Sequence, residues 1–242
     1  MKRIANKNYL EGIFLSLQAI LYVSFLVLDL TSGNNSLSVG IKYTVILLCF
    51  CYALFAKGAY KSIFLIQVAL LFTMISDLFI LILDYYIYGV VSFILVQQLY
   101  SLRLVILQYD GRHKVLALYC KRLLLHITLA TAVYLVLNFS GIALESLLIA
   151  SVFYFICIIS NTFTAIGLAV ADHNNKSNLY YAAGMLLFLL CDINVGLFNL
   201  SGFITLPIDI YSVIYSFSSI LMWTFYAPSQ VLIAISSHYS TK

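Results

Sequence analysis

Long apolar runs separated by short polar segments dominate the chain. A helix needs about 20 apolar residues to cross a hydrocarbon core of about 30 Å, and eight runs approach or exceed that length. We therefore predict an all-α polytopic membrane protein, a bundle of about eight transmembrane helices that forms one integral-membrane domain over residues 1–242. The predicted spans are 10–30, 40–56, 62–83, 87–107, 115–137, 144–170, 179–200 and 208–235.

Composition supports this interpretation. Hydrophobic residues make up 63% of the 242 residues and charged residues 9%, with a mean hydropathy of +1.03. Soluble domains carry about 25% charged residues, so little of the chain is left for a soluble domain. The net charge of +4 comes from basic residues in short loops, and it does not indicate nucleic-acid binding. The first apolar run is too long for a signal-peptide core, so we expect a retained span.

The basic residues predict the orientation of the bundle. Loops on one side of the predicted membrane hold twelve of the thirteen basic residues: Lys2, Arg3, Lys7, Lys57, Lys61, Arg103, Arg112, Lys114, Lys121, Arg122, Lys176 and Lys242. The other loops hold Asp29, Asp84, Glu145 and Asp209. By the positive-inside rule, both termini are expected in the cytoplasm of a cell-membrane protein. Lys42 is the single basic residue on the outer side.

Cysteine and histidine give no sign of a metal site. The chain has five cysteines and four histidines, but none of them shows the spacing of a metal-binding motif or a disulfide framework. We therefore expect neither a metal nor another cofactor.

Two aspartates lie inside apolar runs: Asp77 in FTMISDLFILILDYY and Asp192 in LLFLLCDINVGLF. An aspartate at the centre of a membrane helix costs about 2.5 to 3.5 kcal/mol, which pairing, hydration or protonation must offset. Each lies seven residues before the outer end of its span, at Asp84 or Asn199, which is about 10 Å of helix. Because the two spans run in the same direction, we predict that the acids share a depth and form a functional pair.

Three other spans carry polar stripes at helical spacing. They comprise Phe93, Gln97 and Tyr100; Tyr154, Asn161 and Thr164; and Tyr211, Tyr215, Ser218, Met222 and Tyr226. Such stripes indicate either a wet, hydrogen-bonded interior or contacts between helices worth about 0.6 kcal/mol each.

Four segments carry a family resemblance: MISDLFILI, YGVVSFILVQQLYSLRL, AAGMLLFLLCDINVGLF and MWTFYAPSQVLIAIS. Together they resemble the YhhN family of membrane proteins, which includes the animal lysoplasmalogenases. The residues that match the family pattern are Lys42, Asp77, Gly89, Phe93, Tyr100, Gly184, Phe188, Asp192, Tyr226 and Gln230. Gln97 stands where the family has histidine, so a proton relay through an imidazole is absent, and Cys191 replaces a serine.

The resemblance implies a hydrolase that cleaves the vinyl-ether bond of lysoplasmalogen-type lysophospholipids to a fatty aldehyde and a glycerophospho-head group. A vinyl ether is cleaved by protonation of its outer alkene carbon, followed by attack of water on the oxocarbenium ion. Asp77 and Asp192 suit this chemistry as a catalytic pair. One would stay protonated as the general acid, while the other, ionised, would stabilise the cation and position the water.

We assign substrate contacts to Lys42, Gln97, Tyr100, Asn161 and Tyr215. Lys42 lies at the outer end of its span, one to two turns above the acids if the helices pack together, where it could meet the phosphate of a lysophospholipid. The other interpretation of Lys42 is an interfacial lysine that snorkels to the lipid head groups.

Two other functions are compatible with the sequence. The first is a proton- or cation-coupled transporter or lipid-binding protein that uses the same two aspartates. No pair of helices is interrupted by Gly or Pro in the manner of midplane transport sites, which argues against transport. The second is a structural subunit in which the acids pair with groups of a partner. The expected partners of an enzyme are a lysophospholipid or ether-lipid substrate and the bilayer, and no nucleic acid.

Overall fold

The computed structural model describes residues 2–31, 33–58, 60–109, 114–141, 145–202 and 207–240, and for residues 2–8 and 60 it describes the backbone alone. Within these ranges the chain is all-α, as predicted. Its eight α-helices are α1 (Lys2–Leu30), α2 (Asn35–Leu54), α3 (Tyr60–Asp77), α4 (Tyr86–Gln108), α5 (Val115–Phe139), α6 (Ser146–Ala171), α7 (Lys176–Phe198) and α8 (Ile208–His238). All eight are long and apolar enough to span a membrane, and the chain is a multi-pass membrane protein.

Helices α2 and α7 begin earlier than the hydropathy pattern predicts, because polar residues cap them. The side chain of Asn34 accepts a hydrogen bond from the backbone N–H of Leu37 at 3.1 Å, so α2 begins at residue 35 and not at 40. Asn175 caps α7 in the same way by accepting from two backbone N–H groups, and α7 begins at residue 176 and not at 179. An N-terminal cap stabilises the first turn regardless of its hydropathy.

Helix α1 begins at Lys2, eight residues before the predicted start at 10. The predicted bounds of the other spans agree with the helices to within three residues when the π-helical segment Leu78–Ile82 is counted with α3. The largest of these differences is in α8, which continues through Pro228 and ends at His238, whereas the predicted span ends at 235. Residue 144, the predicted start of the sixth span, lies outside the described residues, as do Arg112 and Lys242.

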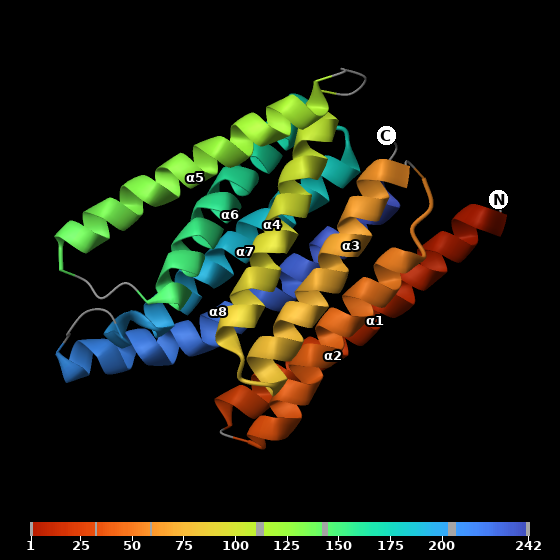
Figure 1. The fold of residues 1–242 in the computed structure, drawn as a ribbon. Coiled ribbons are helices and arrows are strands. Elements are labelled where there is room, and N and C mark those ends of the chain that lie inside the picture. The colour runs from red at the N-terminus through yellow and green to blue at the C-terminus, as the bar shows by residue number, and fades with distance from the viewer. Residues whose placement is uncertain are drawn as a thin grey trace.

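Successive helices run up and down, so both chain termini lie at the same end of the bundle (Figure 1). We call this the terminal end and the opposite one the distal end. Helices α1 and α5 lie at opposite edges: α1 packs on α2 and α8, and α5 packs on α6 and α4 (Figure 1). The remaining six helices hold most of the buried core.

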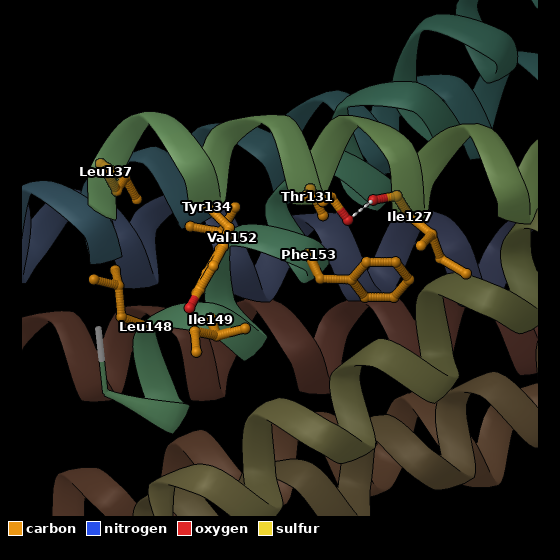
Figure 2. Close-up of a pocket in the computed structure, with 9 residues that line it drawn as sticks. Ile127, Thr131, Tyr134, Leu137, Leu148, Ile149, Val152 and Phe153 are labelled. Carbon is orange, nitrogen blue, oxygen red and sulfur yellow. Dashed lines mark hydrogen bonds between the residues drawn. The ribbon is translucent and has the colours of Figure 1, made fainter. Parts of the chain in front are cut away.

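Helix α5 diverges from α6 toward the distal end (Figure 1). Within its described residues α5 buries one side chain, His126. An apolar groove of about 270 Å³ separates the two helices, and Figure 2 shows its lining side chains on both of them. The groove is lined by Ile127, Ala130, Thr131, Tyr134, Leu137, Leu148, Ile149, Val152 and Phe153.

The end of α3 changes its helical form at the first buried acid. Asp77 is the last α-helical residue, and a π-helical segment, Leu78–Ile82, follows it directly. A side chain at Gly89 would clash with Ile80, so glycine allows α4 to lie directly on this segment. The hydroxyl of Ser76 donates to the carbonyl of Gly89 at 2.6 Å and ties the two helices together. Short π-helical segments occur frequently at functional sites.

Candidate functional site

Asp77 is held in the interior by a tyrosine of another helix. Its side chain is 4% exposed, and Oδ2 accepts a hydrogen bond from the hydroxyl of Tyr226 on α8 at 2.7 Å. Tyr226 is itself buried and lies about one turn after the start of the family segment MWTFYAPSQVLIAIS. A hydrogen bond of this length to a carboxylate fixes the orientation of the acid.

Asp192 on α7 has an equivalent partner. Its Oδ2 accepts a hydrogen bond from the hydroxyl of Tyr154 on α6 at 2.6 Å. Asp192 is partly buried, and the adjacent Cys191 is buried. The two acids therefore occupy similar environments, each with one phenol donor that comes from a different helix.

Aromatic rings connect the two acids. The ring of Phe93 on α4 lies 5.8 Å from Tyr154, 5.8 Å from Phe188 and 6.4 Å from Tyr226, measured between centroids. Phe188 and Tyr226 are 5.5 Å apart. Phe93 therefore contacts the phenol partners of both acids. We call this group the acid site; its members are Asp77, Asp192, Tyr154, Tyr226, Phe93 and Phe188.

Gln97 and Asn161 form a polar layer next to the acid site, on its terminal side. Asn161 donates from Nδ2 to the backbone carbonyl of Gln97 at 2.8 Å and to its Oε1 at 2.9 Å. Arg122 on α5 donates to Oδ1 of Asn161 at 3.0 Å and to three further oxygens of α6. Gln97 also lies beside the hydroxyl of Tyr154. Polar groups therefore extend from Asp192 to Arg122.

Two of the predicted substrate contacts lie away from the acid site. Tyr100 is fully buried, but it follows Phe93 by seven residues, which is about 10 Å along α4. Tyr215 is 43% exposed and stacks on Phe198 with a centroid distance of 4.4 Å. It precedes Tyr226 by eleven residues, which is about 16 Å of helix. Their predicted contact with substrate stays a prediction.

Lys42 is paired with an acid of the neighbouring helix. Its Nζ lies 2.8 Å from Oδ2 of Asp29 and 4.9 Å from the ring centroid of Trp223. Trp223 in turn contacts Tyr226 with a centroid distance of 5.4 Å, so Lys42 is two side chains away from Asp77. The structure shows Asp29 as the partner of Lys42. Contact of Lys42 with a lipid phosphate stays a prediction.

Sequence reasoning missed two features of the interior. Arg103 was counted among the loop charges, yet it is fully buried in α4 and its guanidinium lies over the ring of Tyr181. The position of Arg103 inside the predicted span 87–107 is the sequence signal that indicates its burial. The partnership of Tyr154 and Tyr226 with the acids had no sequence signal, because it joins residues 38 and 149 positions apart.

Among the described residues, no three His, Cys, Asp or Glu side chains gather closely enough to hold a metal ion. None of the acid-site residues lines the groove between α5 and α6.

Comparison with curated proteins and with solved structures yields no match. The model of one protein family, described as the YhhN family, matches residues 37–237, which include both aspartates and their two tyrosine partners. Because this match covers most of the chain, the protein belongs to the YhhN family.

Proposed function

We propose that this protein is a membrane-embedded hydrolase that cleaves the vinyl-ether bond of lysoplasmalogen-type lysophospholipids. The observation that carries the proposal is the acid site, in which two interior carboxyl groups flank a cluster of aromatic rings. Family membership is consistent with such an activity. The overall reaction adds one water to the vinyl ether and releases a fatty aldehyde and the alcohol of the glycerophospho-head group.

The chemistry requires a proton donor and a stabilised cation. One of the two aspartates, in its acid form, transfers a proton to the outer alkene carbon, and the alkene electron pair forms the new C–H bond. The carbon next to the ether oxygen then becomes part of an oxocarbenium ion. The second aspartate, ionised, stabilises this cation, and the faces of Phe93 and Phe188 add cation–π attraction.

Water completes the reaction. The ionised aspartate accepts a proton from the water as it attacks the oxocarbenium carbon, which gives a hemiacetal. The hemiacetal collapses when its hydroxyl gives its proton to the first aspartate and its C–O bond to glycerol breaks. The aldehyde leaves, and the glycerol oxygen takes up the proton that the second aspartate accepted from water. Both carboxyl groups return to their initial states, and no cofactor is required.

The tyrosines orient the two acids for these steps. Tyr226 and Tyr154 each donate to Oδ2 of an aspartate. The described residues donate no hydrogen bond to Oδ1 of either acid, which leaves that oxygen to face substrate or water. A catalytic group held by a second residue loses less rotational freedom in the transition state, and this favours the reaction.

Mass spectrometry of the purified protein tests the proposal. We expect it to release a fatty aldehyde from a lysolipid that carries a vinyl ether. The matched control is a saturated alkyl-ether lysolipid with the same chain and head group, which has no alkene to protonate and should stay intact. In D₂O, one deuterium should appear on the carbon adjacent to the aldehyde group. An intact vinyl-ether lysolipid after prolonged incubation would contradict hydrolysis and favour transport or lipid binding.

A further inference from the structure

A fully buried arginine lies in the terminal half of the bundle. Arg103 on α4 is 0% exposed. Its Nε donates to the hydroxyl of Ser62 at 3.1 Å, and its Cζ lies 4.1 Å from the ring centroid of Tyr181. Its two terminal nitrogens, Nη1 and Nη2, have no hydrogen-bond partner among the described residues. Buried guanidinium groups are normally paired, because the cost of an uncompensated interior charge is large.

Two phenol groups beside this arginine are also without hydrogen-bond partners. Tyr100 and Tyr181 are buried and pack edge to face, with ring centroids 5.6 Å apart. By distance and angle, neither hydroxyl makes a hydrogen bond in the described part of the chain. The hydroxyl of Tyr181 nevertheless interacts with the guanidinium of Arg103, and that of Tyr100 lies near Thr73. Among the described residues, the ion pair that the structure shows joins Lys42 to Asp29. No described carboxylate therefore neutralises Arg103. We call Arg103, Tyr100 and Tyr181 the arginine site.

A polar cavity at the terminal end adjoins the arginine site. The cavity has a volume of about 180 Å³ and is lined by Leu107, Leu168, Ala171, Asp172, Asn175, Ser177, Asn178 and Ser240. The hydroxyl of Ser240 donates to Ser62 at 3.4 Å, and Ser62 is the residue that accepts from Arg103. On α7, Tyr181 lies one turn inward from Asn178. Two hydroxyl groups in series, those of Ser240 and Ser62, therefore connect the cavity with Nε of Arg103.

We propose that the arginine site binds a small phosphate-bearing anion that enters or leaves through the terminal cavity. A guanidinium presents its N–H groups in a planar fork that matches two oxygens of a phosphate. The hydroxyl groups of Tyr100 and Tyr181 provide donors for further oxygens. A phosphate has more oxygens to accept these bonds than a carboxylate, and it supplies the negative charge that the described residues do not.

The arginine site is separate from the acid site, because Arg103 follows Phe93 by ten residues, about 15 Å along α4. The glycerophospho-head group released by the proposed hydrolysis belongs to the class of ligand that fits. Its assignment as the bound anion rests on the proposed function, whereas phosphate binding at Arg103 does not.

Binding of two probes to the purified full-length protein in detergent tests the proposal. The probes are glycerophosphoethanolamine and inorganic phosphate, with an equimolar mixture of glycerol and ethanolamine as the control without phosphate. We expect saturable heat release in calorimetry for a phosphate-bearing probe and none for the control. Tighter binding of the phosphodiester supports a product site, and equal or tighter binding of inorganic phosphate supports a site for free phosphate. Absence of saturable binding for both probes overturns the proposal.

Substitutions locate the site. Arg103→Gln should weaken binding at least about tenfold, because it removes a charge-assisted, two-pronged contact. The matched control is Lys61→Gln, which removes one positive charge from an exposed residue beside Ser62 and should leave binding unchanged. Tyr181→Phe should fold even where Arg103→Gln does not, because it deletes an unpartnered hydroxyl, and it should also weaken binding. The proposal is overturned if Tyr181→Phe binds the probes normally and Arg103→Gln either binds them normally or misfolds. It is also overturned if Lys61→Gln loses as much binding as Arg103→Gln. Asp77→Asn should bind the probes normally, so a failure of the hydrolase activity leaves this result standing.

Discussion

The bundle holds two buried polar clusters that differ in how far their hydrogen bonds are completed by the protein itself. In the acid site, each aspartate already accepts a short hydrogen bond from a tyrosine. In the arginine site, two tyrosines lie beside the cation, but their hydroxyl groups and both Nη atoms have no partner among the described residues. Tyrosine hydroxyl groups therefore hydrogen-bond the charged group in the acid site, whereas those of the arginine site make no hydrogen bond by distance and angle in the described part of the chain.

The difference follows from what each charge can do inside a membrane. An aspartate can avoid the cost of a buried charge by taking up a proton, and a catalytic acid needs that ability to exchange protons. Arginine keeps its proton in proteins, so its charge must be matched by another group. We infer that the acid site is organised to react, whereas the arginine site is organised to receive an anion.

The orientation of the bundle decides which side of the membrane each cluster is nearer to. Reporter fusions test this orientation, and labelling of each loop is expected to be either complete or absent. Reporter fusions in the loops at 29–39 and 201–209 should be labelled from outside, whereas fusions at 108–114 should not. The terminal cavity and the arginine site would then face the cytoplasm. Labelling of the C-terminus from outside would contradict this orientation.

Removal of either acid should have the largest effect on catalysis. Asp77→Asn and Asp192→Asn should each lower turnover about 100- to 10,000-fold, because asparagine can neither donate an acid proton nor carry the negative charge. Aldehyde release measures the loss. The double variant should be little worse than either single one, because groups that act as a unit lose function non-additively.

Thermal melting in detergent separates this result from a structural role for the acids. Asparagine keeps the volume of aspartate and its ability to accept from Tyr226 or Tyr154, so the melting temperature should stay level or rise. A large loss of stability would indicate that the acids pair with buried groups. Normal turnover in a stable Asp192→Asn protein would contradict the two-carboxylate mechanism.

Two tyrosine-to-phenylalanine variants compare the clusters directly. Tyr226→Phe deletes a hydroxyl that donates to Asp77, and it should lower turnover by the equivalent of about 1.5 to 3 kcal/mol, the contribution of a hydrogen bond to a charged group. Tyr181→Phe deletes a hydroxyl without a hydrogen-bond partner, so the free energy of unfolding should stay level or rise. Steady-state kinetics and denaturation of both variants measure the contrast. Equal effects of the two substitutions would show that the tyrosine hydroxyl groups of the two clusters do not differ in their hydrogen bonding.

The fold could be predicted because each helix carries its signal locally. Apolar runs located all eight spans, and the errors at α2 and α7 came from Asn34 and Asn175, whose capping acts against the hydropathy average. Asp77 and Asp192 could be identified as candidates in the same way, since an ionisable residue within an apolar run is visible without a partner.

The remaining parts of the site depend on contacts between helices distant in sequence. Tyr226 shares a stripe with four other residues, and no local feature shows that it, rather than Tyr215, reaches an aspartate. The charge pattern places Arg103 in a loop because it groups basic residues by loop and not by depth in the membrane. The pairing of Lys42 with Asp29 joins two helix ends across a turn, and the charge count placed both residues on one side without linking them.

The smallest expected effect concerns Lys42, which tests whether the acid site has a cation of its own for the lipid phosphate. Lys42→Ala should raise KM by a factor of about two to five, the effect of a contact worth up to about 1 kcal/mol. Turnover at saturation should change less, because the lysine lies away from the reacting carbon. Asp29→Asn is the matched control: it breaks the same ion pair but leaves the lysine in place, so KM should stay level or fall. Both variants should lose similar stability, since both remove one half of the pair. An unchanged KM in Lys42→Ala would show that Lys42 serves the ion pair and the membrane interface, and the arginine site would then be the remaining candidate for contact with phosphate.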